Sequence, residues 1–222
     1  MASSNGASGS DGKVDFKKTA AYRASSKFHL LTLPATTYLM IDGHGDPNTE
    51  PSCQHALQTL YPVAYKLKFA SKASGRDYVV PPLEGLWWAE DMDSFTISRD
   101  KSAWDWTMML AVPDWITRED FTRALEAASA SKQLPALQKL RLDSPEEGSC
   151  VQVLHHGSYD DEAPVLERMH QFIDEQQMKL TGKHHEIYLS DPRRVAPEKL
   201  RTILRQPVAG SLEPKPLAKE MK

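Results

Sequence analysis

The stretch "SCVQVLHHGSYDDE", Ser149–Glu162, decides the fold of this chain because it joins a strand pattern directly to a helix start. A run of β-branched and apolar residues ends at two histidines, and Gly157 then marks a turn. The acidic residues at the end suit the positive N-terminal end of a helix, where Ser158 is a plausible cap with Asp161 three residues further on. A strand, a turn and a helix are therefore predicted in immediate succession.

A helix and another strand follow this stretch. Leu166, Met169 and Ile173 recur at helical spacing within residues 160–177, which predicts one buried helix face. "HHEIYLSDP", residues 184–192, then reads as a strand that Asp-Pro closes. The second half of the chain is thus predicted to run strand, helix, strand.

The first half has the same order of elements. "TTYLMIDGHGDPN" (36–48) predicts a strand and a tight turn, and residues 49–69 predict a helix that Pro62 kinks. "LEGLWWAED" (83–91) and "WDWTMMLAVP" (104–113) are strand candidates, and residues 92–103 between them are predicted to form a hairpin connection. "TREDFTRALEAASA" (117–130) has a good helix start, and "LPALQKLRL" (134–142) predicts a short second helix.

Two similar halves of this kind predict an α+β fold. We expect duplicated strand–helix–strand–strand halves with pseudo-two-fold symmetry, one antiparallel sheet, helices on one face of the sheet, and a ligand cleft on the other.

Composition narrows the class of protein. The chain has 222 residues, enough for one ordinary domain or two small fused halves, and its net charge of −3 gives no basic footprint for nucleic acid. Cys53 and Cys150 lack the spacing of a metal site or a disulfide framework, so we expect reduced thiols in a cytoplasmic protein. No apolar run approaches the roughly 20 residues of a membrane span, and the first residues lack the pattern of a secretory signal. Residues 1–15 and 209–222 are predicted to be flexible tails.

Three apparent motifs are set aside. The glycines of "GHGDPN" are not followed by the Gly-Lys-Ser/Thr of a phosphate loop. "HHEIYL" begins like a zinc-protease motif, but Leu189 stands where the second histidine is needed and the segment is strand-like. Ser158 does not sit in a Gly-x-Ser-x-Gly elbow.

Strand periodicity picks out one carboxylate. Within residues 184–192, Glu186 and Tyr188 share one face, whereas Ile187 and Leu189 mark the other face as core. The strand alone favours an exposed carboxylate without a role. Glu84 is a second candidate, which either lines a ligand cup or pairs with a lysine of the preceding helix.

Aromatic residues are the other candidates. Most aromatic side chains are structural, but a rigid aromatic wall above an acidic group suits flat or cationic ligands. Trp87 and Trp88 are neighbours on one strand and must face opposite ways, so one can serve the core and the other a ligand. The remaining members of the predicted wall are Tyr61, Tyr65 and Trp106.

Taken together, four segments resemble the GyrI-like small-molecule-binding family. They are "LYPVAYKLKF" (60–69), "PLEGLWW" (82–88), "VLHHGSYDDE" (153–162) and "HHEIYLSDPRRVAPEKLRT" (184–202). The likeness spans residues 16–208 and is stronger to the stand-alone branch than to effector domains fused to transcription regulators. The preceding residues are too few for a helix-turn-helix domain.

The resemblance implies a ligand cleft between two related halves, walled by aromatics, with a buried glutamate at the position of Glu186. Members of the family bind bulky, hydrophobic and often cationic compounds. Some stand-alone members are hydrolases that open the cyclopropane of DNA-alkylating natural products of the yatakemycin and duocarmycin type.

On this basis we expect Glu186 to act as a general base toward water, assisted by Tyr65 or Tyr61, without a metal or organic cofactor. Trp87 or Trp88, together with Trp106, would stack on a bulky hydrophobic aromatic ligand, and Glu84 and Tyr188 would line the same site. Two alternatives stay open: a non-catalytic protein that sequesters or senses such compounds, and a protein–protein role like that of relatives proposed to protect DNA gyrase. Neither nucleic acid nor a membrane is an expected partner, and the sequence leaves the oligomeric state open.

Overall fold

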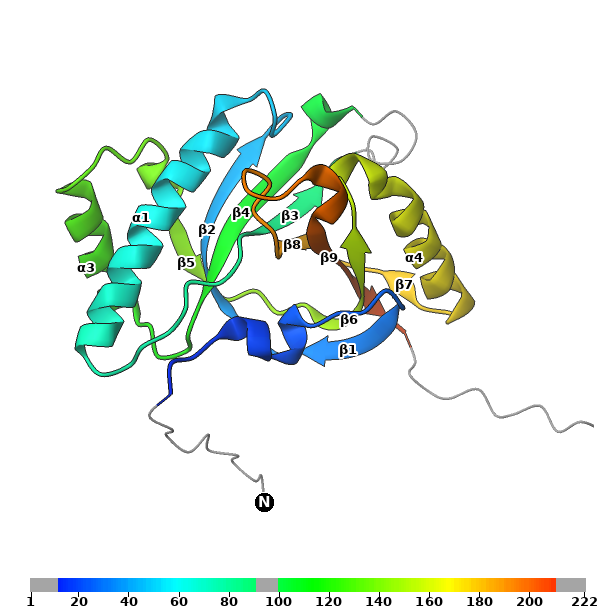
Figure 1. The fold of residues 1–222 in the computed structure, drawn as a ribbon, viewed down its shortest axis with the longest axis horizontal. Coiled ribbons are helices and arrows are strands. Elements are labelled where there is room, and N and C mark those ends of the chain that lie inside the picture. The colour runs from blue at the N-terminus through cyan, green and yellow to red at the C-terminus, as the bar shows by residue number, and fades with distance from the viewer. Residues whose placement is uncertain (1–11, 91–99, 211–222) are drawn as a thin grey trace, which may run out of the picture.

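The computed structural model describes residues 12–90 and 100–210, which form nine strands, three α-helices and several short 3-10 turns (Figure 1). The helices are α1 (Pro51–Ala73), α3 (Arg118–Ser129) and α4 (Ala163–Glu175). The strands are β1 (His29–Leu33), β2 (Thr37–His44), β3 (Glu84–Trp88), β4 (Asp105–Val112), β5 (Arg141–Asp143), β6 (Gly148–His156), β7 (Lys179–Leu180), β8 (His184–Tyr188) and β9 (Arg201–Ala209).

The sheet consists of two halves with the same topology. Its order is β1-β6-β9-β8-β3-β4-β2-β5, with β7 added to β9, and every pairing between these strands is antiparallel. The unit β2–α1–β3–β4 is repeated as β6–α4–β8–β9, and β3 pairs with β8 where the halves meet. The predicted α+β fold with duplicated strand–helix–strand–strand halves is therefore confirmed.

The central register assigns each side chain to a face. Gly85 lies opposite Glu186, and Leu86 lies opposite His185. Because side chains alternate along strands, Trp87, Glu186 and Tyr188 share one face, and Glu84 lies on the other.

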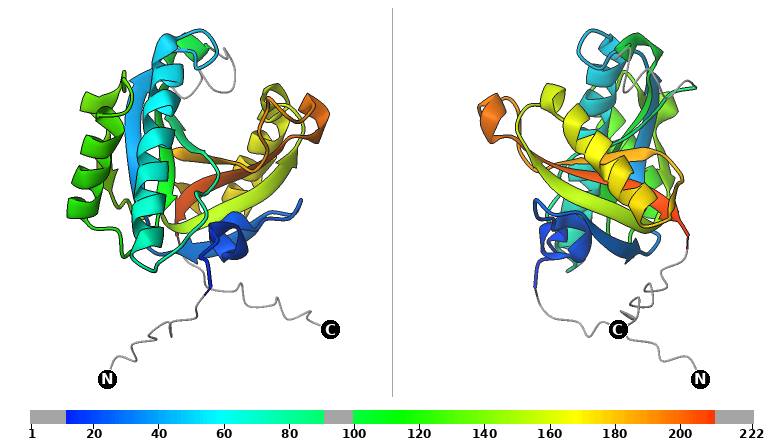
Figure 2. Two further views of the ribbon diagram at one scale, coloured as in Figure 1. Left: turned by 60° about the vertical axis from the view of Figure 1, so that its left-hand side comes forward. Right: turned by 90° about the vertical axis from the view of Figure 1, so that its right-hand side faces the viewer.

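All three helices lie on the face that carries Glu186, and in two views α1 and α4 stand apart over the two halves (Figure 2). Under α1, Leu39, Ile41 and Leu110 of the sheet pack against Leu60 and other apolar residues of the helix. Under α4, a smaller core joins Val151, Val153, Leu204 and Val208 to Met169 and Ile173. Each helix thus covers its own half by burying one apolar stripe.

Local sequence signals explain how the helices begin. Pro51 occupies the first turn of α1, where a missing backbone N–H costs nothing. Thr117 caps α3 in a capping box with Asp120, as predicted. None of the helices within the described residues is long and apolar enough to cross a membrane.

Gly43, near the end of β2, is explained by packing rather than by phosphate binding. A Cβ at this position would overlap the ring of Trp106, which stands on the neighbouring strand opposite Gly43. Trp106 is fully buried, and its indole N–H donates to the carbonyl of Gly45 at 3.2 Å. Glycine therefore allows the largest core side chain to lie flat against β2.

The face opposite the helices is closed at its centre by the N-terminal segment 12–28. Tyr22 packs there on Ile187 and Ile203, and Phe16 packs on Tyr22 and on Met40 and its neighbours. The expected position of the ligand cleft therefore needs a correction: the face opposite the helices is filled around β3 and β8, and Glu186 lies on the helix-bearing face.

The structure also differs from the sequence-based prediction in two other elements. Residues 134–142 form a 3-10 turn, Leu137–Lys139, and then strand β5, so the predicted helix is wrong: after the turn, the chain pairs with β2 instead. Strand β1 was not predicted. The predicted hairpin connection at 92–103 falls mostly outside the described residues, as do most of the predicted tails, residues 1–11 and 211–222.

Candidate functional site

A chain of hydrogen bonds connects three side chains on the helix-bearing face of the central strands. The indole N–H of Trp87 donates to the Tyr188 hydroxyl oxygen at 3.0 Å, and the Tyr188 hydroxyl donates to Glu186 Oε2 at 2.7 Å. Gly85 makes room for this chain, because a Cβ there would lie 2.8 Å from Trp87 Nε1 and 3.0 Å from the Tyr188 oxygen. Glu186 is thus oriented from β3 and β8 together.

A second carboxyl group, that of Glu162, lies next to Glu186. Glu162 is 5% exposed and stands at the start of α4, immediately after a 3-10 turn. Burial, followed by the nearby negative charge of Glu186, raises the pKa of Glu162 well above its ordinary value. Glu162 therefore holds its proton to a higher pH than an ordinary carboxyl group does.

Buried polar atoms without a hydrogen bond of normal geometry gather at the same place. Three of the six such side-chain atoms in the described part of the chain are Glu162 Oε1, His184 Nε2 and Thr202 Oγ1. His184 Nε2 lies 3.6 Å from Glu186 Oε1, and Thr202 is the register partner of Tyr188. A buried polar atom without a partner costs about 1–3 kcal/mol, so several together are typical of a functional site.

Aromatic rings surround the carboxyl pair. Tyr159 contacts Tyr188 edge to face with ring centroids 5.5 Å apart, and Trp104 contacts Trp87 in the same manner at 5.7 Å. Burial and neighbouring carboxylates raise the pKa of Tyr188 well above its ordinary value and that of Tyr159 to about 12. Both phenols therefore stay neutral and remain hydrogen-bond donors at physiological pH.

This arrangement can perform proton-transfer chemistry in an aromatic environment. A carboxylate at the position of Glu186 can accept a proton from water, and Tyr188 fixes its orientation. Among the described residues, no group of three or more His, Cys, Asp and Glu side chains has the arrangement of a metal site.

The sequence and fold match a known family. Residues 26–209 match the model of the GyrI-like small molecule binding domain. The chain belongs to the GyrI-like family. No curated protein matches it.

Several solved structures are similar to this chain. An uncharacterized conserved protein from Listeria innocua is 41% identical, with a TM-score of 0.82, and the match covers 89% of this chain and all of that one. A hydrolase from Listeria innocua is 39% identical with a TM-score of 0.78 over the same shares. The C-terminal domain of EcmrR, at 13% identity and a TM-score of 0.53 over 83% of this chain and 98% of that one, shares the fold.

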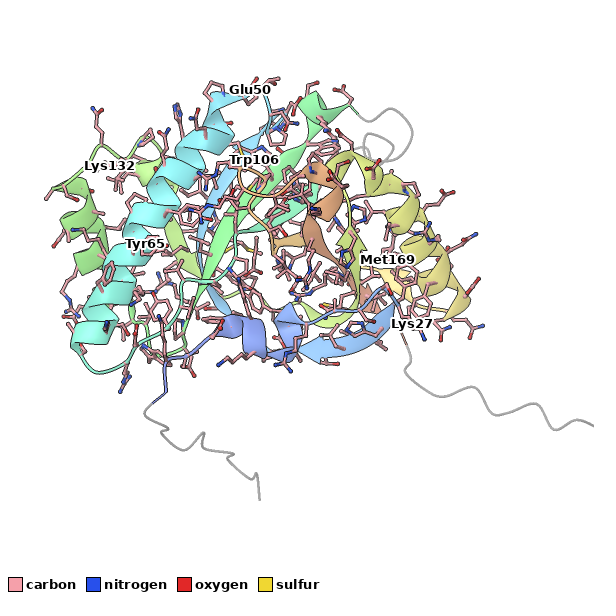
Figure 3. The ribbon with its side chains drawn as sticks, viewed as in Figure 1. Lys27, Glu50, Tyr65, Trp106, Lys132 and Met169 are labelled. Atoms are coloured by element: carbon pink, nitrogen blue, oxygen red, sulfur yellow. The ribbon has the colours of Figure 1, made fainter. Side chains whose placement is uncertain are left out.

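The GyrI-like fold brings together only some of the predicted site residues. Glu186, Tyr188 and Trp87 form the hydrogen-bonded chain described above. Trp106 does not join them as a stacking surface, because it is fully buried beneath α1 (Figure 3). Trp88 lies on the opposite face with the Lys183 ammonium 3.1 Å from its ring centroid, which is a cation–π contact.

Glu84 also lies on the opposite face and has no exposed surface. It accepts hydrogen bonds from the Tyr22 hydroxyl and from His185, at 2.9 Å for the latter. Lys68, one of its expected partners, pairs with Asp77 instead. Neither expectation for Glu84, a place in the ligand cup or a pairing with a helix lysine, agrees with the structure.

Tyr61 and Tyr65 of α1, the two tyrosines expected to assist Glu186, make other contacts. Tyr65 is 48% exposed and stacks on Phe69 one turn further along the helix (Figure 3). Tyr61 is half-buried, packs against the core under α1, and lies near Asp191 and Arg193. The phenol that donates to Glu186 is Tyr188, two residues away on the same strand, rather than Tyr65 or Tyr61.

Sequence reasoning missed Glu162, His184 and Thr202 as members of this cluster. Glu162 was interpreted only as a favourable charge at a helix start, and its burial depends on the way α4 lies over β9 and β8. The internal repeat offered a signal, because the turn before α4 faces the centre of a duplicated sheet.

Proposed function

We propose that this GyrI-like chain is a hydrolase that adds water across the strained cyclopropane of flat, aromatic DNA-alkylating compounds of the yatakemycin and duocarmycin type, and so detoxifies them. The observation that carries the proposal is the Trp87–Tyr188–Glu186 chain of hydrogen bonds with the buried Glu162 next to its end. A solved relative 39% identical over its full length bears the name hydrolase.

The proposed reaction needs one base and one water molecule. Glu186 takes a proton from water as the water oxygen bonds to a CH₂ carbon of the cyclopropane, and the bond from that carbon to the ring carbon shared with the dienone breaks. The electron pair of that bond moves into the conjugated dienone and forms a phenolate, which takes a proton from solvent. Glu186 then releases its proton, so water has been added overall and the site is restored.

The buried polar atoms beside Glu186 that lack a well-formed hydrogen bond could hold the attacking water. Glu162, His184 and Thr202 together present an oxygen, a nitrogen and a hydroxyl beside the Glu186 carboxylate. A water molecule needs two to four such partners to be held in a buried place. Relief of ring strain supplies driving force, so a small catalytic set is sufficient.

A non-catalytic binding protein is the second candidate function. The family is described as a small-molecule-binding one, and the aromatic surroundings of Glu186 suit binding without turnover. Such a protein would sequester bulky aromatic or cationic compounds.

Turnover decides between the two. Purified protein is mixed with yatakemycin or a duocarmycin in excess, and the water adduct is followed by mass spectrometry. The proposal expects many turnovers per protein, a loss of about 10²–10⁴-fold in Glu186→Gln, and no loss in Glu167→Gln, which changes an exposed glutamate of α4. Binding of one equivalent without adduct would assign the protein to the sequestering class.

A further inference from the structure

His184 lies next to Glu186, the candidate base, and the proposed reaction gives it no specific role beyond that of one polar group near the water. It is 9% exposed, and its Nε2 lies 3.6 Å from Glu186 Oε1 without a hydrogen bond of its own. The other carboxylate oxygen of Glu186, Oε2, is already held by Tyr188 at 2.7 Å. One oxygen of the carboxylate is therefore fixed, and the second faces a buried imidazole.

We propose that His184 is a positioning residue for Glu186, which donates from Nε2–H to Oε1 while Tyr188 holds Oε2. A separation of 3.6 Å exceeds the usual 2.7–3.2 Å of a hydrogen bond, but catalytic hydrogen bonds are often long before a ligand binds. A small rotation of either side chain closes the contact. The carboxylate is then held at both oxygens in the plane from which it accepts a proton from water.

The groups around His184 are consistent with a donor at this position. His170 of α4 lies beside it, and burial, followed by the proximity of His184, lowers the pKa of His170. His170 is therefore neutral at physiological pH and brings no competing positive charge. The pKa of Glu162 at the start of α4 is raised by burial and by Glu186, and Tyr188 and Tyr159 are neutral.

The alternative is a histidine that only fills space. In the sheet register His184 lies opposite Trp87, so the two side chains are neighbours on the helix-bearing face. A space-filling role predicts that any side chain of similar size will serve, whereas a positioning role needs an N–H at the place of Nε2.

The kinetic test uses this difference and rests on the proposed hydrolase function. His184→Met keeps the volume and removes the donor, and His184→Gln places an amide N–H near the position of Nε2. We expect His184→Met to lower kcat about tenfold with little change in KM, and to move the acid limb of the kcat/KM–pH profile to higher pH. His184→Gln should recover most of both effects, and His170→Gln should resemble wild type.

Two kinetic results would overturn the positioning role. One is full activity in a folded His184→Met variant. The other is equal loss in His184→Met and His184→Gln without a shift of the pH profile, which is the behaviour of a purely structural residue.

A spectroscopic test separates this proposal from the hydrolase proposal. In ¹⁵N-labelled protein, the long-range imidazole spectrum reports whether Nε2 of His184 carries the proton and how its shift responds to Glu186→Gln. A protonated Nε2 whose shift moves in that variant supports the positioning role even if wild type shows no turnover, in which case only the hydrolase function fails. An unprotonated or unresponsive Nε2 overturns the proposal whatever the kinetics show.

Discussion

Two glutamates on the paired central strands have opposite surroundings. Glu84 lies on the closed face, where Tyr22 and His185 donate to it and where no surface is exposed. Glu186 lies on the helix-bearing face, where one donor holds it and orphaned polar atoms stand nearby. Glu84 and Glu186 are one register position apart on paired strands, so the strands carry a satisfied carboxylate on one face and an incompletely satisfied one on the other.

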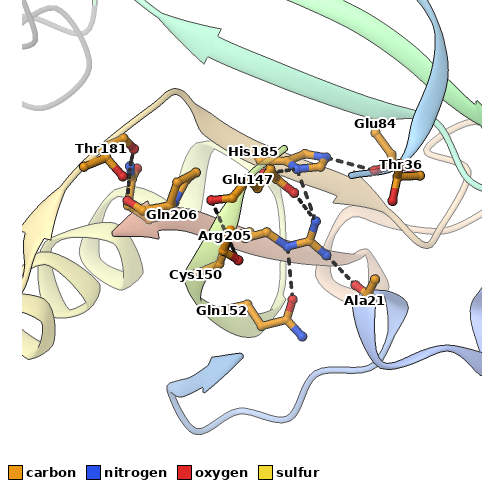
Figure 4. Close-up of polar contacts among 12 residues, drawn as sticks. Ala21, Thr36, Glu84, Glu147, Cys150, Gln152, Thr181, His185, Arg205 and Gln206 are labelled. Carbon is orange, nitrogen blue, oxygen red and sulfur yellow. Dashed lines mark hydrogen bonds and ion pairs between the residues drawn. The ribbon is translucent and has the colours of Figure 1, made fainter. Parts of the chain in front are cut away.

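The closed face owes its stability to a connected network (Figure 4). His185 bonds Glu84 on one side and Glu147 on the other, at 2.9 and 2.8 Å. Arg205 bonds Glu147 at 2.7 Å and Gln152 at 3.2 Å, and it also donates to the carbonyl of Ala21. Two acidic and two basic groups balance, and the N-terminal segment is attached to the sheet. A buried network in which every polar group is hydrogen-bonded stabilises the fold. A network with unpaired polar groups is a candidate site for a ligand or a reaction.

The same substitution at the two glutamates is the strongest test of this contrast. Glu84→Gln should lower the free energy of unfolding by about 3 kcal/mol, because it removes one of the two carboxylates that balance the buried His185 and Arg205. Glu186→Gln should change stability by less than about 1 kcal/mol, since the amide removes a negative charge next to the buried Glu162. Urea unfolding measures both. Equal losses would show that the two faces do not differ in the manner described.

The second largest effect should be the pH dependence of stability, which the network on the closed face produces. Burial alone would raise the pKa of Glu147, but His185 and Arg205 lower it to about 2. The contribution of Glu147 is therefore present above its unfolded value and is lost as the pH falls from about 4.5 to about 2. It amounts to roughly 3 kcal/mol, and acid titration of the unfolding free energy measures it. Arg205→Met should flatten this acid-side dependence.

On the alkaline side, stability should depend on pH with the opposite sign. Burial would lower the pKa of His185, but Glu147 and Glu84 outweigh it and raise the value. The contribution of His185 is complete below its unfolded pKa of about 6.5 and is lost as the pH rises through the raised folded value. The network should thus contribute most between about pH 4.5 and 6.5, and a network contribution that increases above pH 7 would contradict the assignment.

Gly85→Ala should act on the other face with a smaller effect. The added Cβ meets Trp87 Nε1 and the Tyr188 oxygen, so the indole or the phenol must shift. We expect a loss of about 1–2 kcal/mol in stability and a loss of about tenfold in turnover of the cyclopropanoid substrate. Gly75→Ala, at a glycine with open space around it, controls for removing a glycine, although its positive φ of 85° adds some strain of its own. Normal turnover in Gly85→Ala would show that the Trp87–Tyr188 contact does not orient Glu186.

Tyr65→Phe should have the smallest effect. The Tyr65 side chain is half-exposed and keeps its stacking on Phe69 when only the hydroxyl is removed. We expect turnover and stability within about twofold and 0.5 kcal/mol of wild type. A strong loss of kcat would restore Tyr65 as the assisting tyrosine. Tyr188→Phe is the matched comparison and should lose activity.

The sequence by itself determined the duplicated order of elements and the fact that Glu186 and Tyr188 share one face of their strand. Period-two alternation placed Glu186 and Tyr188 together and opposite Ile187, because alternation is a local property of any strand. The capping box at Thr117 and the apolar stripe of α4 were likewise local. Family likeness added the expectation that this carboxylate is buried.

The tertiary structure alone decided which face of the sheet is closed and which residues meet across the halves. The N-terminal segment covers the face of Glu84, and no local pattern shows that Tyr22 will meet a residue 62 positions away. Glu162 becomes a partner of Glu186 only when α4 lies over the second half. Burial, register between distant strands and the resulting pKa of Glu162 depend on long-range packing, which local periodicity does not encode.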